Sequence, residues 1–276
     1  MNIIHGIINK LRRIKHEKII IPVFKTISGE QILDGKIVMI TGGTGGIGIV
    51  IAKSAIQCGA KVIVCGTDVA KIERCCSELG DRAKGLCINL GDCSSLSDSV
   101  EKAIDLFSEN RIDILINAAG IHGDWDFMNF DEHMFDSVMA VNVKGTYYIS
   151  QLIAKQMIEK GIRGHILNFA SSSSLRPAWT PYQISKWAVC GMTKGLADVL
   201  LPYGIIVNAI APGPTATPMV KADNTNLFLY SQPSHRYATP EEIANLAIFM
   251  VSPMGDMIVG DTYYITGGSG TLSYHT

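Results

Sequence analysis

One stretch decides the fold: Ile37-Val38-Met39-Ile40-Thr41-Gly42-Gly43-Thr44-Gly45-Gly46-Ile47-Gly48. Its first four residues form a short apolar run, as expected for a parallel strand buried on both faces. Glycines follow directly, and a helical pattern then continues to Gly59. In such a unit the helix N-terminus offers free N–H groups, and the glycines let a pyrophosphate approach the backbone. The stretch therefore predicts a dinucleotide-binding site near the start of a domain.

Strand and helix patterns alternate along the rest of the chain. After the first strand, further strands are predicted at 61–65, 83–88, 112–116, 165–169, 205–210 and 262–266. The helices between them include 69–79, 96–109 and 182–200, and another begins at Thr239. This alternation predicts an α/β fold in which helices flank a doubly wound parallel β-sheet of about seven strands.

Length and composition indicate one globular domain. The 276 residues are 47% apolar and 18% charged, and no linker divides the region 33–276, which is the predicted catalytic domain. The net charge of −1 gives no reason to expect nucleic acid as a partner. The seven cysteines lack metal-ligand spacing, so we expect no metal, and they favour a reducing, cytoplasmic compartment.

Residues 1–32 are expected to form an N-terminal amphipathic helix and an extended arm. Isoleucines and a leucine recur at helical spacing over 3–14 among lysines and arginines, and Pro22 interrupts the apolar run that follows. A basic amphipathic helix can lie on a membrane surface. Packing against its own domain or a sister subunit is the favoured interpretation. A membrane-spanning helix is not expected, since the sequence has no run of about 18 apolar residues.

The residues that follow the second and fourth strands suit a dinucleotide. After the second strand, such folds carry an acid for NAD or a nearby basic residue for NADP. Here the sequence is Gly66-Thr67-Asp68, in which Thr67 could donate to a 2′-phosphate and Asp68 could accept from a 2′-hydroxyl. The choice between NAD and NADP therefore stays open. After the fourth strand comes 117–120, Asn-Ala-Ala-Gly, where small residues admit a ribose and the asparagine can bridge strand ends.

A tyrosine and a lysine stand at helical spacing in the helix predicted at 182–200. Tyr182 and Lys186 are four residues apart and therefore share one helix face. A phenol titrates near about 10, and a fixed cation lowers its pKa toward the range of an acid/base catalyst. Asn142 lies in the middle of another predicted helix, where asparagine is unfavourable, which indicates a hydrogen-bonding task.

Together these motifs resemble the short-chain dehydrogenase/reductase family in its ordinary-length branch. The resemblance covers about 33–268 and implies a Rossmann-like fold. It also implies an NAD(P)-dependent oxidoreductase that transfers a hydride between the nicotinamide and a secondary alcohol or ketone. The residues that carry it occur in one order at compatible separations: Thr41, Gly42, Gly46, Gly48, Asn117, Gly120, Asn142, Ser171, Tyr182, Lys186, Pro212, Gly213 and Thr217.

The resemblance implies four catalytic residues. Tyr182 would be the general acid/base, and Lys186 would lower its pKa and bind the nicotinamide ribose. Ser171 would hold the substrate oxygen, and Asn142 would hold a water that links Lys186 to solvent. The connection from Ser171 to Tyr182 is one or two residues shorter than is usual in the family, so Ser172 is an alternative to Ser171.

The resemblance also implies the binding residues. Substrate would contact Ser171, Trp179 and Tyr182, and His122 faces the same cleft, although a lone histidine is more often a spectator. Gly45 stands where NADP-preferring members often carry arginine. The cofactor would contact Gly42, Thr44, Gly46, Ile47, Gly48, Thr67, Asn89, Leu90, Asn117, Ala118, Gly120, Tyr182, Lys186, Pro212, Gly213, Thr215 and Thr217.

Two alternative functions remain at this stage. One is a catalytically silent dinucleotide-binding regulator, although the intact set of catalytic residues argues against it. The other is a dehydrogenase or epimerase of a sugar-derived substrate, since the predicted lid at 218–237 is polar. The expected partners are a small-molecule carbonyl or alcohol substrate and further copies of the chain, as a homodimer or homotetramer.

Overall fold

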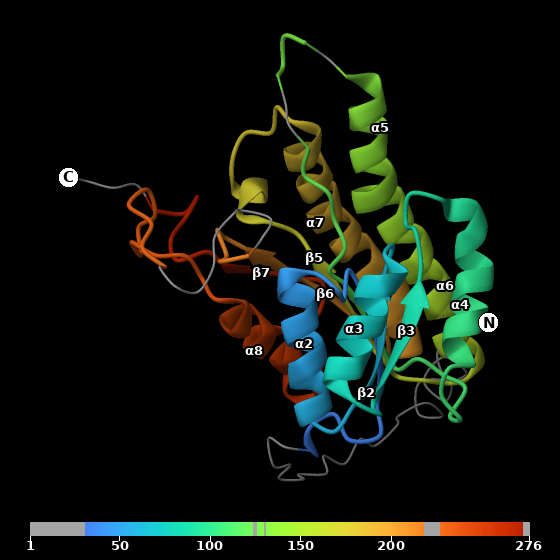
Figure 1. Ribbon diagram of the computed structural model, residues 1–276. Coiled ribbons are helices and arrows are strands. Elements are labelled where there is room, and N and C mark those ends of the chain that lie inside the picture. Colours follow the sequence, from blue (N-terminus) through green and yellow to red (C-terminus); the bar gives the residue numbers. More distant parts are fainter. Residues whose placement is uncertain (1–30, 124–125, 130, 218–226, 273–276) are drawn as a thin grey trace, which may run out of the picture.

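Seven parallel strands form one sheet in the order β3-β2-β1-β4-β5-β6-β7, in a computed structural model that describes residues 31–123, 126–129, 131–217 and 227–272 (Figure 1). The predicted doubly wound sheet of about seven strands is confirmed. The chain leaves β1 in one direction and returns to its other side with β4, and ligands bind at such a switch point, beyond the carboxyl ends of the strands. The strands are β1 (Ile37–Thr41), β2 (Lys61–Gly66), β3 (Ala83–Cys87), β4 (Ile114–Asn117), β5 (His165–Phe169), β6 (Ile206–Pro212) and β7 (Thr262–Ile265).

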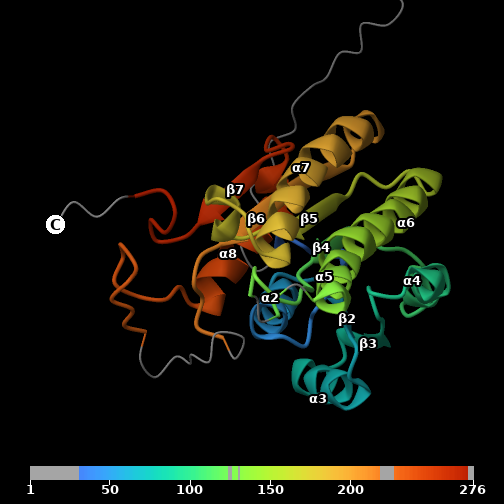
Figure 2. The ribbon, with the colours of Figure 1, turned by 90° about the horizontal axis from the view of Figure 1, so that it is seen from above.

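Helices cover both faces of the sheet (Figure 2). One core lies between the sheet and α4, α6 and α7. The other lies between the sheet and α2 and α8, with α3 packed at its edge. The helices are α2 (Gly46–Gln57), α3 (Val69–Leu79), α4 (Leu96–Ile104), α5 (Glu132–Met139), α6 (Thr146–Glu159), α7 (Pro181–Leu200) and α8 (Pro240–Met250).

Capping residues start the two helices that sequence patterns placed best. In α7, the Thr180 side chain accepts from the backbone of Gln183, whose own side chain accepts from the Thr180 backbone. Thr239 and Glu242 make the same reciprocal pair at α8, as predicted. These capping boxes satisfy backbone donors that a helix start leaves without partners. The box on α7 fixes where the helix that carries Tyr182 begins.

Two predicted helices differ from the structure by more than one or two terminal residues. The helix predicted at 96–109 ends at Ile104, because the chain turns there and buries the Phe107 ring in the core. The segment around Asn142 is a π-helical turn, η3 (Ala140–Gly145), between α5 and α6. A Cβ at Gly145 would overlap the carbonyl oxygen of Leu90, so only glycine lets η3 pack this closely. Such π-turns are frequent at functional sites.

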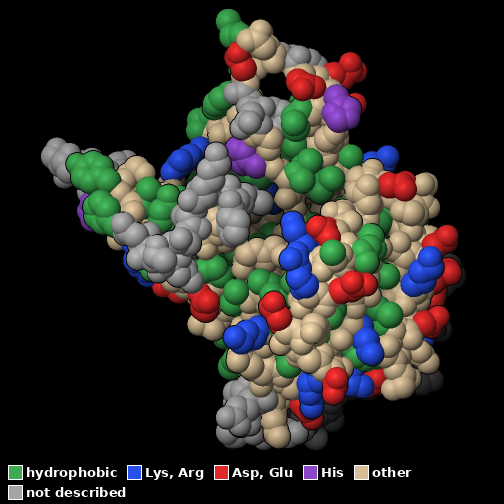
Figure 3. Space-filling view, in the orientation of Figure 1, with side chains coloured by type: hydrophobic (Ala, Val, Ile, Leu, Met, Phe, Trp, Pro, Cys, Tyr) green, Lys and Arg blue, Asp and Glu red, His purple; other side chains and the backbone are tan. Residues whose placement is uncertain are grey.

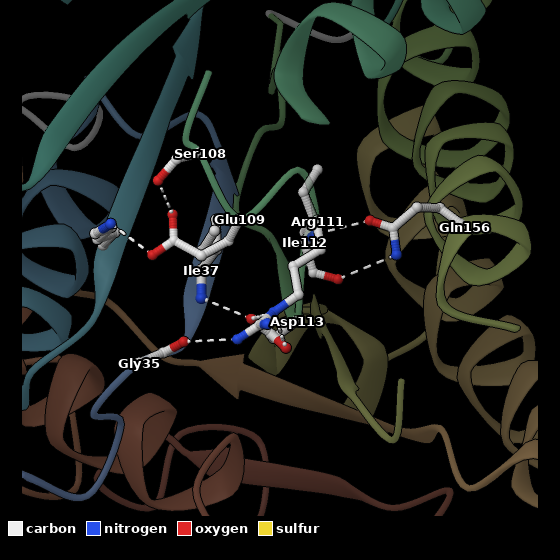
Figure 4. Close-up of polar contacts among 9 residues, drawn as sticks. Gly35, Ile37, Ser108, Glu109, Arg111, Ile112, Asp113 and Gln156 are labelled. Atoms are coloured by element: carbon white, nitrogen blue, oxygen red, sulfur yellow. Dashed lines mark hydrogen bonds and ion pairs between the residues drawn. The ribbon is translucent and has the colours of Figure 1, made fainter. Parts of the chain in front are cut away.

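Polar contacts fix the edge of the sheet opposite the carboxyl ends (Figure 4). Buried Asp113 accepts from the backbone N–H of Ile37 at 2.9 Å and from Arg111 Nε at 3.1 Å. Gln156 of α6 accepts from the Ile112 N–H at 2.6 Å. These bonds tie β1, β4 and α6 together and hold the register in which the functional ends of β1 and β4 lie side by side.

The surface agrees with the near-neutral charge. On the face seen in Figure 3, side chains of Lys and Arg lie interspersed with those of Asp and Glu. Within the part of the chain that the structure describes, no helix has the length and apolar character needed to cross a membrane. The predicted amphipathic helix and residues 218–226 of the predicted lid lie outside the described residues, so the boundary between arm and domain stays a prediction.

Candidate active site

A cleft of about 660 Å³ opens at the carboxyl ends of β1, β2, β3 and β4. Most predicted cofactor residues line it: Gly42, Thr44, Gly46, Ile47, Gly48, Thr67, Asn89, Leu90, Ala118, Gly120 and Thr217. Eight further residues that were not among the predicted cofactor contacts also line it: Thr41, Gly45, Gly66, Lys71, Ile88, Ala119, Ile121 and Val141.

The glycine loop lines the cleft, and side chains at two of its glycines would collide with neighbouring backbone. Gly42 has a φ of +66°, and a Cβ there would lie 2.8 Å from the backbone of Ala119. A Cβ at Gly48 would overlap the Gly42 carbonyl oxygen. At the start of α2, Gly45 offers no side-chain cap, so the first N–H groups of the helix face the loop. The loop therefore fits the pyrophosphate of a dinucleotide.

The end of the cleft beside β2 is cationic and hydroxyl-bearing. Thr44, Thr67 and Lys71 line it. The Asp68 carboxylate caps α3 instead, since its Oδ1 accepts from the Lys71 N–H at 3.0 Å. Gly66 ends β2 with no room for a side chain, because a Cβ would lie 2.9 Å from Thr44 Oγ1. Sequence reasoning missed Lys71, although its spacing of three from the capping Asp68 places it on the first turn of α3.

Several predicted cofactor residues do not line the cleft. The Asn117 side chain donates to Ser150 Oγ and to Asn168 Oδ1, both at 2.9 Å, and is 2% exposed. It bridges neighbouring strand ends, as the sequence suggested, and its amide nitrogen is used inside the protein. Thr215 donates to the carbonyl of Gly213 at 3.0 Å. Pro212, Gly213 and Thr215 thus shape the end of β6, while Thr217 reaches the cleft.

Tyr182 and Lys186 are brought together by the first turns of α7. Lys186 is buried, its Nζ lies 5.5 Å from the centre of the Tyr182 ring, and it donates to the Phe169 carbonyl at 2.7 Å. Burial lowers the pKa of Lys186 to about 8. Burial also raises the pKa of Tyr182, against a hydrogen bond with Ser171 that lowers it. The net shift of the Tyr182 pKa is therefore upward, because desolvation dominates, and the lowering by Lys186 stays a prediction.

Ser171 is the serine that contacts the phenol. It caps the short helix η4 (Ser172–Leu175), with its Oγ accepting from the Ser173 N–H at 3.1 Å and contacting Ser173 Oγ at 3.2 Å. Its hydrogen bond with Tyr182 acts on the pKa of that residue. Ser172 lies within η4 instead. This geometry favours Ser171 over the alternative Ser172.

Asn142 locks the loop after β4 onto α7. Its Oδ1 accepts from the Ile121 N–H at 2.9 Å, and its Nδ2 donates to the Ile121 carbonyl and to Ser185 Oγ, both at 3.0 Å. The side chain is 1% exposed. Its amide is therefore engaged by protein groups on both sides, and the water-holding role implied by the resemblance stays a prediction.

Two aromatic side chains were candidates for substrate contact. The His122 ring packs on the Tyr182 ring with centroids 4.5 Å apart, so it belongs to the site. Trp179 is 54% exposed just before α7, and its backbone N–H donates to Gln183 Oε1. Its contact with substrate stays a prediction. Within the described residues, no cluster of metal-ligating side chains is present.

Comparisons with known proteins agree with this geometry. A family model described as short chain dehydrogenase matches residues 36–227. The chain is 36% identical over 242 residues to the 3-oxoacyl-[acyl-carrier-protein] reductase of Haemophilus influenzae, which covers 86% of this chain and 98% of that protein. It is 33% identical over 247 residues to the 2-dehydro-3-deoxy-D-gluconate 5-dehydrogenase of Dickeya dadantii, with 86% and 96% covered. The structure of 3-ketoacyl-(acyl-carrier-protein) reductase from Brucella melitensis complexed with NADH matches with a TM-score of 0.79 at 32% identity, covering 87% of this chain and 100% of that chain.

Proposed function

This chain belongs to the short-chain dehydrogenase family, and from that membership we propose that Tyr182 is the acid/base of its reaction. The protein is an NAD(P)-dependent oxidoreductase. The proposed reaction moves a hydride between the nicotinamide and a secondary alcohol or ketone. The proposal is carried by the closeness of Lys186 to the cleft. Gly120 lines the cleft wall, and a Cβ added to it would lie 3.6 Å from Lys186 Nζ. The Lys186 side chain, which lies beside Tyr182, is therefore next to a residue that lines the cleft.

The protein groups divide the work of ketone reduction. When bound, reduced nicotinamide would supply the hydride for the carbonyl carbon. Tyr182 donates its phenolic proton to the carbonyl oxygen, so that a ketone becomes an alcohol and the tyrosine is left as a phenolate. Ser171 holds the same oxygen beside the phenol, and the Lys186 ammonium stabilises the phenolate. Alcohol oxidation runs through the same groups in reverse.

The direct test is a panel of ketones, 3-oxoacyl thioesters and sugar-derived carbonyl compounds, with the matching alcohols. Each carbonyl compound is mixed with the purified protein and NADPH or NADH, and each alcohol with NADP+ or NAD+, and the absorbance of the reduced nicotinamide is followed. Consumption of reduced nicotinamide with a ketone, and formation of reduced nicotinamide with the matching alcohol, supports the proposal. The panel also separates a sugar-derived substrate from an acyl one. Tight dinucleotide binding without turnover on any member would favour the silent regulator.

We also propose that NADP is the preferred dinucleotide. The support is threefold: the end of β2 has no room for an acid, the Asp68 carboxylate is used as a helix cap, and Lys71 lines the cleft beside Thr44 and Thr67. A 2′-phosphate is recognised by cations and hydroxyls, whereas a 2′-hydroxyl is held by an acid.

Lys71→Ala is expected to weaken NADPH binding about tenfold at low salt while NADH binding changes less than about twofold, because a charged hydrogen bond to phosphate is lost. Thr67→Ala should act in the same direction. Affinities are measured by titrating the fluorescence of each reduced dinucleotide. Lys84→Ala, an exposed lysine on β3 that does not line the cleft, is the matched control. Equal losses for the two dinucleotides would contradict the preference.

We propose that the chain self-associates through α6 and α7. A groove of about 710 Å³ beside these helices is lined by Tyr147, Val199 and other apolar residues. A Cβ at Gly195 would meet nothing within 4 Å, so a partner helix can approach α7 closely. Exposed Lys194 and Asp198 stand one turn apart. In an antiparallel pair of α7 helices, each would meet its opposite charge, which favours a second copy as the occupant.

Gly195→Glu is expected to shift the protein to a smaller species, because it places a charge and added bulk where two α7 helices would meet. The substitution itself favours the helix, so folding is retained. Sedimentation or light scattering gives the mass of the species in solution. Ser77→Glu, on the exposed face of α3, should leave that mass unchanged. An unaltered mass for Gly195→Glu would place the contact elsewhere.

We further propose a reducing, cytoplasmic setting for the protein. This rests on its seven cysteines, all of which are free.

A further inference from the structure

The loop after β4 places an imidazole ring against the catalytic phenol. The rings of His122 and Tyr182 have centroids 4.5 Å apart and planes inclined by 42°. The other side of the imidazole is also held, since Nδ1 lies 2.7 Å from the carbonyl oxygen of Gly123. A carbonyl only accepts, so Nδ1 carries the proton. Gly123 has a φ of +77°, a conformation that glycine adopts without strain.

The same loop is tied to α7 by a second route. Asn142 bonds both the N–H and the carbonyl of Ile121, and it also donates to Ser185 Oγ. Ser185 Oγ in turn donates to the Tyr182 carbonyl at 2.7 Å. The contacts form a closed circuit from the Tyr182 ring through His122, Ile121, Asn142 and Ser185 to the Tyr182 backbone. Asn142 and Ser185 are at most 1% exposed, so water does not compete for these bonds.

A circuit of this kind restricts the phenol more than the helix alone does. Tyrosine can rotate about two side-chain bonds, and proton transfer needs its hydroxyl within about 3 Å of the substrate oxygen. Aromatic pairs attract at the observed separation in a tilted arrangement. On the same ring, Lys186 Nζ lies 5.5 Å from the centroid. The imidazole is therefore a ring-packing contact from outside α7, beside the Ser171 hydrogen bond, that is placed to hold the phenol in its catalytic orientation.

We propose that His122 is a positioning residue for Tyr182: its ring packs on the phenol, holds it toward the substrate oxygen and shields it from water. This inference rests on the proposed acid/base role of Tyr182. It assigns the loop residue, rather than helix α7 alone, the task of orienting the acid. A flat ring is what the role requires, so a phenyl group at the same position should substitute for the imidazole.

The test compares His122→Ala with His122→Phe, using the substrate found in the panel. His122→Ala is expected to lower kcat 10- to 100-fold, because a misplaced acid loses that much, while the KM for NADPH stays within about twofold. His122→Phe should keep kcat within about threefold of the parent. His133→Ala, on the exposed surface of α5, is the matched control and should change neither constant. Melting temperatures of all three should match the parent within a few degrees.

The pH profile of ketone reduction separates positioning and shielding from a merely structural role. The titratable groups that face the phenol are Lys186 from α7 and His122 from the loop, with the Ser171 hydroxyl from the end of β5. Both variants lack the imidazole, so any difference between them comes from the phenyl ring that only His122→Phe carries. Reduction needs the protonated phenol and is lost above its pKa. In His122→Ala, water reaches the phenol, and this loss should move to lower pH than in His122→Phe.

Two results would overturn the inference. One is a kcat for His122→Ala within twofold of the parent. The other is a His122→Phe variant as slow as His122→Ala, which would assign the effect to imidazole chemistry instead of packing. Failure of the acid/base proposal is seen separately, as turnover in a Tyr182 variant that lacks the hydroxyl.

Discussion

Tyr182→Phe is expected to lower turnover about 10³-fold or more while dinucleotide binding changes less than about threefold. The substitution removes one oxygen and leaves the ring that packs on His122 and lies beside Lys186. What is lost is the proton donor, and a positioned acid/base group contributes typically 10²- to 10⁴-fold. The measurement is the initial rate of reduced-nicotinamide consumption at saturating substrate. Fluorescence titration of NADPH gives the binding constant of the same preparation.

Tyr264→Phe is the matched control. Its hydroxyl lies 3.3 Å from Ser174 Oγ in η4, so this variant also loses a hydroxyl hydrogen bond close to Ser171. It should keep turnover within about threefold of the parent. Normal turnover in Tyr182→Phe would contradict the proposed acid/base role of Tyr182. A tenfold loss of NADPH affinity in that variant would show that the phenol serves binding more than chemistry.

The directions of the pKa shifts determine which protonation states Tyr182 and Lys186 have near neutral pH. Burial raises the pKa of Tyr182, so at pH 7 the phenol carries its proton and is ready to donate it to a carbonyl. Lys186, with its pKa lowered to about 8, still carries its charge at that pH and loses it as the pH rises through 8. Reduction uses the protonated phenol, whereas oxidation of an alcohol needs the phenolate. The protonation state at neutral pH therefore suits the proposed donation of a proton from Tyr182 to a ketone.

Local patterns in the sequence were sufficient to predict the sheet and the glycine loop. A buried strand between loops is an apolar run, so β1 could be placed from Ile37–Thr41 before any contact was known. Capping residues fixed the start of α8 for the same reason, since the Thr239 and Glu242 bonds join residues three apart. The loop glycines are required by backbone contacts a few residues away, such as that between Gly48 and Gly42.

Contacts between distant residues could not be derived from such patterns. The rings of His122 and Tyr182 meet although 60 residues separate them along the chain, and Asn142 joins Ser185 across 43 residues. The net sign of the Tyr182 pKa shift could not be derived from spacing for a related reason. Spacing places Lys186 nearby, but desolvation depends on everything packed around the phenol, which is a property of the folded protein. Lys71 was missed because its position in the cleft depends on how α3 is capped.

Gly48→Ala is expected to weaken dinucleotide binding by up to about 100-fold, and Gly45→Ala, three residues earlier in the same loop, is the matched control. A Cβ at Gly48 would overlap the Gly42 carbonyl oxygen and lie 2.9 Å from its carbon. Backbone atoms cannot rotate away as a side chain can, so the loop and the start of α2 must separate. Overpacking costs about 1–3 kcal/mol, and the upper end of that range corresponds to roughly a 100-fold loss of affinity.

A Cβ at Gly45 would lie 3.3 Å from the same carbonyl oxygen, and its backbone is in the extended region that alanine also adopts. Gly45→Ala should therefore bind NADPH within about threefold of the parent. Fluorescence titration measures binding, and thermal melting shows whether the loss in Gly48→Ala is confined to the cleft or spreads through α2, whose buried face packs on α8. Equal NADPH affinity of the two alanine variants would mean that the loop moves to accommodate a Cβ at Gly48. The close approach of α2 to the loop would then not be required for the pyrophosphate site.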